Sequence, residues 1–139
     1  MIEEIENIVC IGEKLPPEYL HAPDRETTVK EARQIIMYLA KTETRLTHAL
    51  IGGYFGQDHA TSSNSCKRIN DLIDTDPLFR AKVRGYTDQV RDIYNQVTKI
   101  ETVSATLNSL LTGIEIMEAR LLSMRESFEN LKSEINKLK

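Results

Sequence analysis

The sequence predicts an all-α protein, in which a small helical domain over residues 1–78 is followed by a long coiled-coil helix over residues 79–139. Three observations predict this class. Apolar residues recur every three or four positions along most of the chain, which is the spacing of one face of a helix. The alternation of β-branched and polar residues that is typical of a half-buried strand does not occur. All four prolines lie at or before residue 77.

Length and composition limit the possibilities further. The chain has 139 residues, enough for one small domain with an extension, and it contains no tryptophan, which indicates a small aliphatic core. No apolar run reaches the roughly 18 residues of a membrane helix, and the acidic N-terminus does not resemble a signal peptide. Cys10 and Cys66 alone do not suggest a disulfide framework. We therefore expect a cytoplasmic protein of bacterial or phage origin.

The domain is expected to begin with a short amphipathic helix over residues 2–10, with Ile2, Ile5 and Val9 on one face. Residues 11–24 contain three of the four prolines. Such a segment is expected to form a loop, with one helical turn over residues 17–20.

A longer helix is expected over about residues 28–43. Thr27 or Thr28 is its expected N-cap, and Glu31 stands three residues after Thr28, where it completes a capping box. The buried face of this helix is predicted to consist of Val29, Ala32, Ile36, Leu39 and Ala40.

Residues 46–72 then carry a helix-turn-helix pattern, in which Gly56-Gln57-Asp58 forms the turn. Asp58 is the expected N-cap of the second helix, which begins at His59. In such motifs the second helix can enter the major groove of DNA. Pro77 is expected to start the next helix. The apolar anchors of the motif are expected to be Tyr38, Leu39, Leu50, Ile51, Tyr54 and Phe55.

Three segments of this region resemble a known family. They read ARQIIMYLA from Ala32, IGGYFGQDHAT from Ile51 and CKRI from Cys66, and they look like the C-terminal DNA-binding domain of the bacterial replication initiator DnaA. The resemblance is traceable from about Ile2 to Pro77. Nothing in the chain resembles the ATPase domain of that family. The resemblance implies a DNA-binding protein that regulates replication or transcription.

The resemblance and the local charge together give a set of candidate DNA-binding residues. Some positions depart from the family pattern: Gln57 replaces an arginine, Ala60 replaces a threonine, and residues 21–24, ending in Asp24, replace a strongly basic run. Arg33 is expected to support helix packing or to contact one phosphate. The candidates are Arg25, Lys30, Arg45, Gln57, Asp58, His59, Thr61, Asn64, Lys67 and Arg68.

Each candidate also has a purely structural explanation. Asp58 caps a helix whether or not DNA binds, and Lys67 and Arg68 are compatible with an ordinary solvated face. Charge supports the structural explanation, because residues 1–78 contain eight Lys and Arg against thirteen Asp and Glu, a net charge of −5. DNA-binding domains are usually basic. The alternative to DNA binding is therefore a scaffold protein that keeps the helix-turn-helix fold for its packing alone. If DNA is bound, we expect weak binding per protomer and nucleoid association.

The second feature of the chain is an apolar stripe along residues 103–138. Its members alternate between steps of four and three, which is typical of a coiled coil. The same alternation occurs upstream from Val83 to Ile100, and the two frames meet in a step of three where four is expected, a stammer. The stripe consists of Val103, Leu107, Leu110, Ile114, Met117, Leu121, Met124, Phe128, Leu131, Ile135 and Leu138.

Such a stripe is expected to pair with another copy or to fold back as a hairpin. Gly113 is the candidate break for a hairpin, and Gly85 is the candidate boundary between domain and helix. We favour oligomerisation, with the number and direction of the strands left open.

No enzyme site is expected. The three histidines and two cysteines have no metal-ligand spacing, and no phosphate-binding glycine loop occurs. Gly52-Gly53 is expected to permit close helix packing. We therefore expect no metal, no cofactor, no small-molecule substrate and no membrane contact; the expected partners are double-stranded DNA and further copies of the chain.

Overall fold

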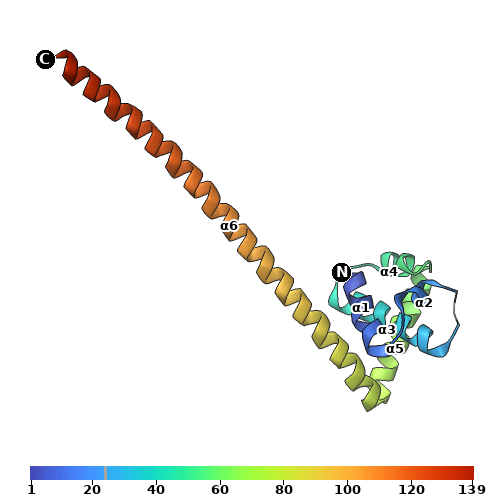
Figure 1. Ribbon diagram of the computed structural model, residues 1–139. Coiled ribbons are helices and arrows are strands. Elements are labelled where there is room, and N and C mark those ends of the chain that lie inside the picture. Colours follow the sequence, from blue (N-terminus) through green and yellow to red (C-terminus); the bar gives the residue numbers. More distant parts are fainter. Residues whose placement is uncertain (24) are drawn as a thin grey trace. The chain divides into compact units, whose positions relative to one another are not determined.

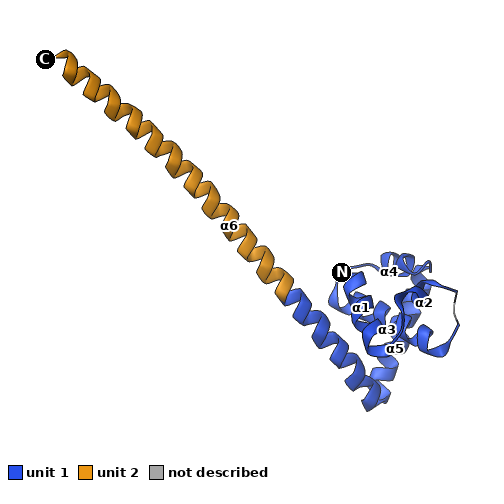
Figure 2. Ribbon diagram, viewed as in Figure 1, with its two compact units in different colours: residues 1–95 blue, residues 96–139 orange. Residues whose placement is uncertain are grey.

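The computed structural model describes residues 1–23 and 25–139, and within them it contains six helices and no strand, which confirms the all-α class (Figure 1). The chain divides into two compact units, residues 1–95 and residues 96–139 (Figure 2). The helices are α1 (Ile2–Glu13), α2 (Pro17–His21), α3 (Thr27–Glu43), α4 (His48–Tyr54), α5 (His59–Thr75) and α6 (Pro77–Lys137).

Helix α3 is the centre of the first unit and packs against α1, α2, α4 and α5. All five residues predicted for its buried face are fully buried. Ile35 and Met37 are also buried, because a helix that is covered by several neighbours is apolar around most of its circumference.

The expected capping box at the start of α3 does not form. The N-cap position is Glu26, and no side chain makes a capping hydrogen bond there. Thr27 and Thr28 lie inside the first turn, where the backbone is already helical, so neither residue has the extended conformation of an N-cap.

Helix α1 extends three residues beyond the expected end. It continues through Gly12 to Glu13, and Lys14 ends it in the left-handed conformation, with φ of 56°. The ring of Tyr86 packs against Gly12, at the position that a side chain would occupy. Because Gly12 has no side chain, α1 can continue to Glu13 while the ring of Tyr86, which belongs to α6, packs against it.

The junction between α5 and α6 is where the sequence predicts it. Helix α5 ends at Thr75 and α6 begins at Pro77. The carboxylate Oδ1 of Asp76 accepts hydrogen bonds from the backbone N–H groups of Leu78, at 2.9 Å, and Phe79, at 3.2 Å. These bonds satisfy donors that lack partners in the first turn of a helix.

The first turns of α6 belong to the core of the first unit. Phe79, Val83, Tyr86 and Val90 are buried in the same cluster as α1, α3 and α5. Gly85, the candidate boundary between domain and helix, lies inside the continuous helix α6. The compact unit therefore extends to residue 95, beyond the division expected at residue 78.

Ion pairs also connect α6 to the rest of this unit. The Lys82 ammonium lies 3.0 Å from the Glu13 carboxylate and 2.8 Å from that of Glu31. The Arg91 guanidinium makes two hydrogen bonds to Glu43, of 2.8 and 3.1 Å. Three carboxylates of α1 and α3 are thus matched by cations from α6.

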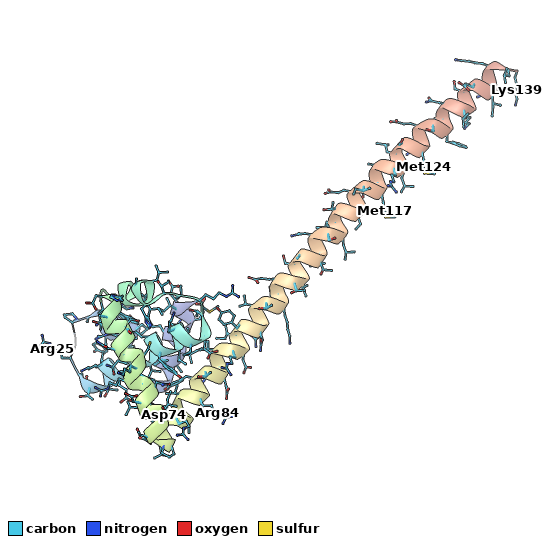
Figure 3. The ribbon with its side chains drawn as sticks, turned by 180° about the vertical axis from the view of Figure 1, so that it is seen from behind. Arg25, Asp74, Arg84, Met117, Met124 and Lys139 are labelled. Atoms are coloured by element: carbon cyan, nitrogen blue, oxygen red, sulfur yellow. The ribbon has the colours of Figure 1, made fainter. Side chains whose placement is uncertain are left out.

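The second unit consists of the remainder of α6. The helix runs through Thr112 and Gly113 without interruption, so the hairpin alternative does not occur in this structure. The eleven residues of the apolar stripe are between 51% and 88% exposed, including Met117 and Met124 (Figure 3). At 1.5 Å per residue, α6 is about 90 Å long.

Candidate nucleic-acid interface

The helix-turn-helix consists of α4, a short turn and α5. The Asp58 carboxylate accepts a hydrogen bond of 2.8 Å from the Thr61 backbone N–H, which confirms the predicted N-cap of α5. The hydrogen bonds with Thr61 hold the pKa of Asp58 below its ordinary value. Helix α4 is capped in the same way, because the Thr47 hydroxyl accepts from the Leu50 N–H.

Two glycines define the turn. The backbone of Gln57 and Asp58 passes so close to Gly52 that an added Cβ would lie 2.5 Å from the Asp58 carbonyl oxygen. The Gln57 N–H also donates to the Gly52 carbonyl, at 2.8 Å. Gly56 has φ of 65°, a conformation that glycine adopts readily. The close packing expected of Gly52-Gly53 holds for Gly52 only, since nothing lies within 4 Å of the Gly53 position.

Polar contacts from α5 fix it against its neighbours. The fully buried Ser62 hydroxyl lies 3.1 Å from the Nδ1 of His48 on α4. The Cys66 thiol donates to the Met37 carbonyl on α3, at 3.5 Å. The anchor predicted at Leu50 is wrong: its side chain is 62% exposed, because the short α4 packs through Ile51 instead.

The opposite side of α5 is open to solvent. His59 and Thr61 are exposed in its first turn, and Asn64, Lys67 and Arg68 are exposed further along. The spacing of three and four residues places the last three on one face. This exposed face of α5 therefore presents two cations and an amide beside the capped end of the helix.

A cleft of about 330 Å³ lies beside the start of α5. It contains four of the ten candidates, and these come from three parts of the chain: the loop before α3, the first half of α3, and the turn with α5. Sequence reasoning missed Gln34 and Ser65, although Gln34 stands one helical turn after Lys30. The lining consists of Arg25, Lys30, Arg33, Gln34, Met37, Gln57, Thr61 and Ser65.

Arg33 supports packing, which is one of the two roles predicted for it. Its guanidinium donates hydrogen bonds to the carbonyl oxygens of Leu20, at 2.8 Å, and Ala22, at 3.2 Å. These bonds fix the backbone at the end of α2 and in the residue that follows it. Asp24, which was predicted to weaken a basic loop here, lies outside the described residues.

Arg45 does not line the cleft. It is exposed in the segment between α3 and α4. The structure thus places four candidates around the cleft, several along the exposed face of α5, and this one on a separate loop.

His21 has a structural role that sequence reasoning did not anticipate. Its Nε2 lies 2.9 Å from the buried carboxylate of Glu6, and its ring contacts Tyr54 edge-on and stacks on Phe55. Burial, together with a hydrogen bond to Glu6, raises the pKa of Tyr54. Where the family has a basic run, this chain therefore has a residue that joins α1, α2 and α4.

The remaining reactive groups are dispersed. Among the described residues, no three His, Cys, Asp or Glu side chains are placed to hold a metal ion. Burial raises the pKa of Cys10 to about 11, and it also raises the pKa of Cys66, so both remain thiols near neutral pH. Within the same residues, none of the helices has the length and apolar character needed to span a bilayer.

Comparisons with known proteins agree with the resemblance seen in the sequence. Residues 2–69 match the family described as the bacterial DnaA protein helix-turn-helix. The chain is 38% identical over 85 residues to the chromosomal replication initiator protein DnaA of Bacteroides fragilis, a match that covers 60% of this chain and 18% of the relative. The corresponding protein of Campylobacter concisus is 35% identical over 90 residues, covering 64% of this chain and 21% of the relative.

The chain therefore spans about a fifth of the length of these relatives, and the whole of α6 lies beyond the family match. Just under half of the chain, residues 2–69, thus matches the bacterial DnaA helix-turn-helix family.

Proposed function

We propose that this protein binds double-stranded DNA through the exposed face of α5 and self-associates through the apolar stripe of α6. The family of residues 2–69 supports the first part, because the relatives are chromosomal replication initiators. The exposure of the stripe supports the second part. A role in regulating replication or transcription follows from the kind of protein that shares this domain.

The observation that carries DNA binding is the composition of the exposed face of α5. Asn64 has the amide that can make two hydrogen bonds to adenine in a major groove. Lys67 and Arg68, one turn further along, have the charges that contact phosphates. Arg25 and Lys30 at the cleft extend the positive surface beyond the helix itself.

The acidic composition argues less strongly against DNA binding when the charges of the whole first unit, residues 1–95, are counted. Residues 1–95 contain twelve Lys and Arg against fifteen Asp and Glu, a net charge of −3 in place of −5 for residues 1–78. Glu13, Glu31 and Glu43 are paired with cations of α6, away from α5. A modest number of phosphate contacts still implies weak binding per protomer, which pairing of two chains would strengthen.

The remaining acidic excess favours a second candidate, a scaffold protein whose helix-turn-helix no longer binds nucleic acid. In that case α6 is the functional part and the exposed face of α5 is an ordinary solvated surface. The two candidates differ in their response to salt, because phosphate contacts make the binding constant fall linearly with salt on logarithmic axes.

The test is fluorescence anisotropy of the full chain on labelled duplexes of random sequence, at several salt concentrations. We expect binding at low salt, with a slope that falls by about one for each phosphate contact removed in Lys67→Ala or Arg68→Ala. Arg84→Ala is the matched control, since it removes the same charge from the first unit but lies outside the proposed surface. Absence of binding at low salt, or equal effects of all three variants, would reject DNA binding through α5.

A further inference from the structure

The apolar stripe of α6 has a flanking charge pattern that selects one way of pairing. We propose that two copies of the chain pair through residues 107–138 in antiparallel orientation, with Leu107 of each copy facing Leu138 of the other. The inference rests on the proposed self-association and adds its direction and register. The stripe is exposed along an unbroken helix, and burying it against a second copy removes this apolar surface from water.

The heptad positions follow from the spacing of the stripe. Leu107, Ile114, Leu121, Phe128 and Ile135 occupy position a, and Leu110, Met117, Met124, Leu131 and Leu138 occupy position d. The charged residues that flank the stripe are then Glu118, Arg125, Lys132 and Lys139 at position e, and Arg120 and Glu134 at position g.

Parallel pairing brings like charges together. In a parallel dimer each g residue faces the e residue five positions later in the partner, so Arg120 faces Arg125 twice. Glu134 also faces Lys139 twice, so the attraction and the repulsion offset each other. Parallel pairing therefore gains no net attraction from its flanking charges.

Antiparallel pairing removes this conflict in one register. Position e then faces e, and with Leu107 opposite Leu138 the carboxylate of Glu118 meets Arg125 of the second copy, twice by symmetry. Within the stripe Phe128 faces Met117, an aromatic and thioether pair that packs favourably. All ten stripe residues from Leu107 to Leu138 then face an apolar residue of the second copy.

Neighbouring antiparallel registers are less favourable. A shift of one heptad towards Val103 brings Glu118 against Glu118 and Arg120 against Arg120. A shift of one heptad the other way pairs Glu118 with Lys132 and Arg120 with Glu134, but it brings Arg125 against Arg125 and leaves Leu107 and Leu110 of both copies without partners. Burial of those four leucines contributes more than exposed ion pairs do. A shift of two heptads towards Val103 places Glu118 against Leu111 and Ile135 against Gln96. In the proposed register Leu111 instead faces Lys132, whose aliphatic stem can cover it. The two chains enter the pair from opposite ends, about 46 Å apart at 1.5 Å per residue.

Sedimentation equilibrium of the full chain tests the proposal with Arg125→Glu, Glu118→Arg and the double variant, at low salt. Each single variant places like charges opposite each other twice, so we expect a dimer about tenfold weaker than the unmodified protein. The double variant restores opposite charges and should recover the original affinity. Lys137→Glu and Glu115→Arg are matched controls on the outer face of the helix.

The outcomes separate this inference from the one it rests on. A parallel dimer would be strengthened by Arg125→Glu, which then faces Arg120, and left unchanged by Glu118→Arg. That result, the absence of any effect in both single variants, or a particle larger than a dimer overturns the antiparallel pairing while self-association stands. A chain that remains monomeric at all concentrations overturns the proposed self-association itself.

Discussion

The two halves of α6 have the same apolar spacing but different environments. Val83, Tyr86 and Val90 are 2%, 6% and 2% exposed, because they pack into the core of their own chain. Leu107 and Leu110, in the same kind of pattern, are 55% and 60% exposed. The comparison shows that a heptad pattern predicts that a helix face will be buried but does not identify the surface that covers it.

The change of frame follows closely after the change of environment. The step of three that interrupts the alternation lies between Ile100 and Val103, shortly after the first unit ends at residue 95. The upstream frame runs mainly along the part of α6 that packs on its own chain, and the downstream frame runs along the exposed part. The interruption in the sequence therefore marks the place where packing within the chain ends and a separate apolar face begins.

The largest expected effect comes from placing a charge in each half. Val90→Asp buries a carboxylate among apolar side chains and should destabilise the first unit by more than about 3 kcal/mol. Leu121→Asp should leave the stability of that unit unchanged and abolish self-association. All five tyrosines lie between residues 19 and 94, so the tyrosine band of the near-UV circular dichroism spectrum of the full chain reports on the first unit alone. A loss of this signal in Leu121→Asp would contradict the separation of the two halves.

Gly12 and Gly85 give a second contrast, between a packed position and an open one. Gly12→Ala places a methyl group against the Tyr86 ring, and such overpacking should cost about 1–3 kcal/mol of unfolding free energy. Gly85→Ala is the matched control, since its methyl group meets nothing within 4 Å and should stabilise α6 by about 0.5–1 kcal/mol. Urea unfolding of both variants, followed through the tyrosines, measures the difference. Equal stabilities would show that Tyr86 does not pack on α1.

A smaller effect is expected from Tyr86→Phe. Its hydroxyl donates to the Glu13 carboxylate at 2.9 Å, so its removal should cost about 0.5–1.5 kcal/mol. Burial, followed by this hydrogen bond, raises the pKa of Tyr86 above its ordinary value of 10. Folding thus favours the neutral phenol, and stability should fall as pH rises above about 10, where the unfolded chain ionises. The variant should lose less stability than the unmodified protein between pH 9 and 11, which unfolding titrations at several pH values would show.

The smallest effect is expected from Lys82→Met. The ammonium pairs with two carboxylates, but its side chain is 33% exposed, so solvent screening should keep the loss of stability below about 1 kcal/mol. The loss should diminish further in 1 M salt. Because methionine keeps an apolar stem, a loss that is large and independent of salt would indicate that the two ion pairs are shielded from solvent and contribute more than surface pairs do.

Local signals in the sequence predicted most of the helices. Asp58 and Pro77 define helix starts through interactions with their immediate neighbours, and such positions can be located without knowledge of the fold. Thr28 failed as a cap because α3 begins at Thr27, so that Glu26 takes the N-cap position. The end of the first unit was missed because the burial of Tyr86 depends on Gly12, 74 residues earlier in the chain.

Part of the arrangement of the candidate residues could be anticipated from the sequence. Arg25, Lys30, Gln57 and Thr61, which were named from the resemblance and from local charge, come from distant positions and line one cleft, and Asp58 caps α5 as expected. The pairing of His21 with Glu6 was not predictable, because neither residue belongs to a motif and the contact exists only once α1 and α2 have packed together. The same applies to the hydrogen bond between Ser62 and His48.

The extent of the first unit has a consequence for how this domain can be moved between proteins. The family model ends at residue 69, whereas the matches to the two initiators cover 85 and 90 residues and the compact unit includes α6 as far as residue 95. A segment cut at residue 69 would lose Val83 and Val90 from the buried cluster that they share with Ile5 and Ile36. Any exchange of this domain with relatives therefore has to carry the first turns of α6 along.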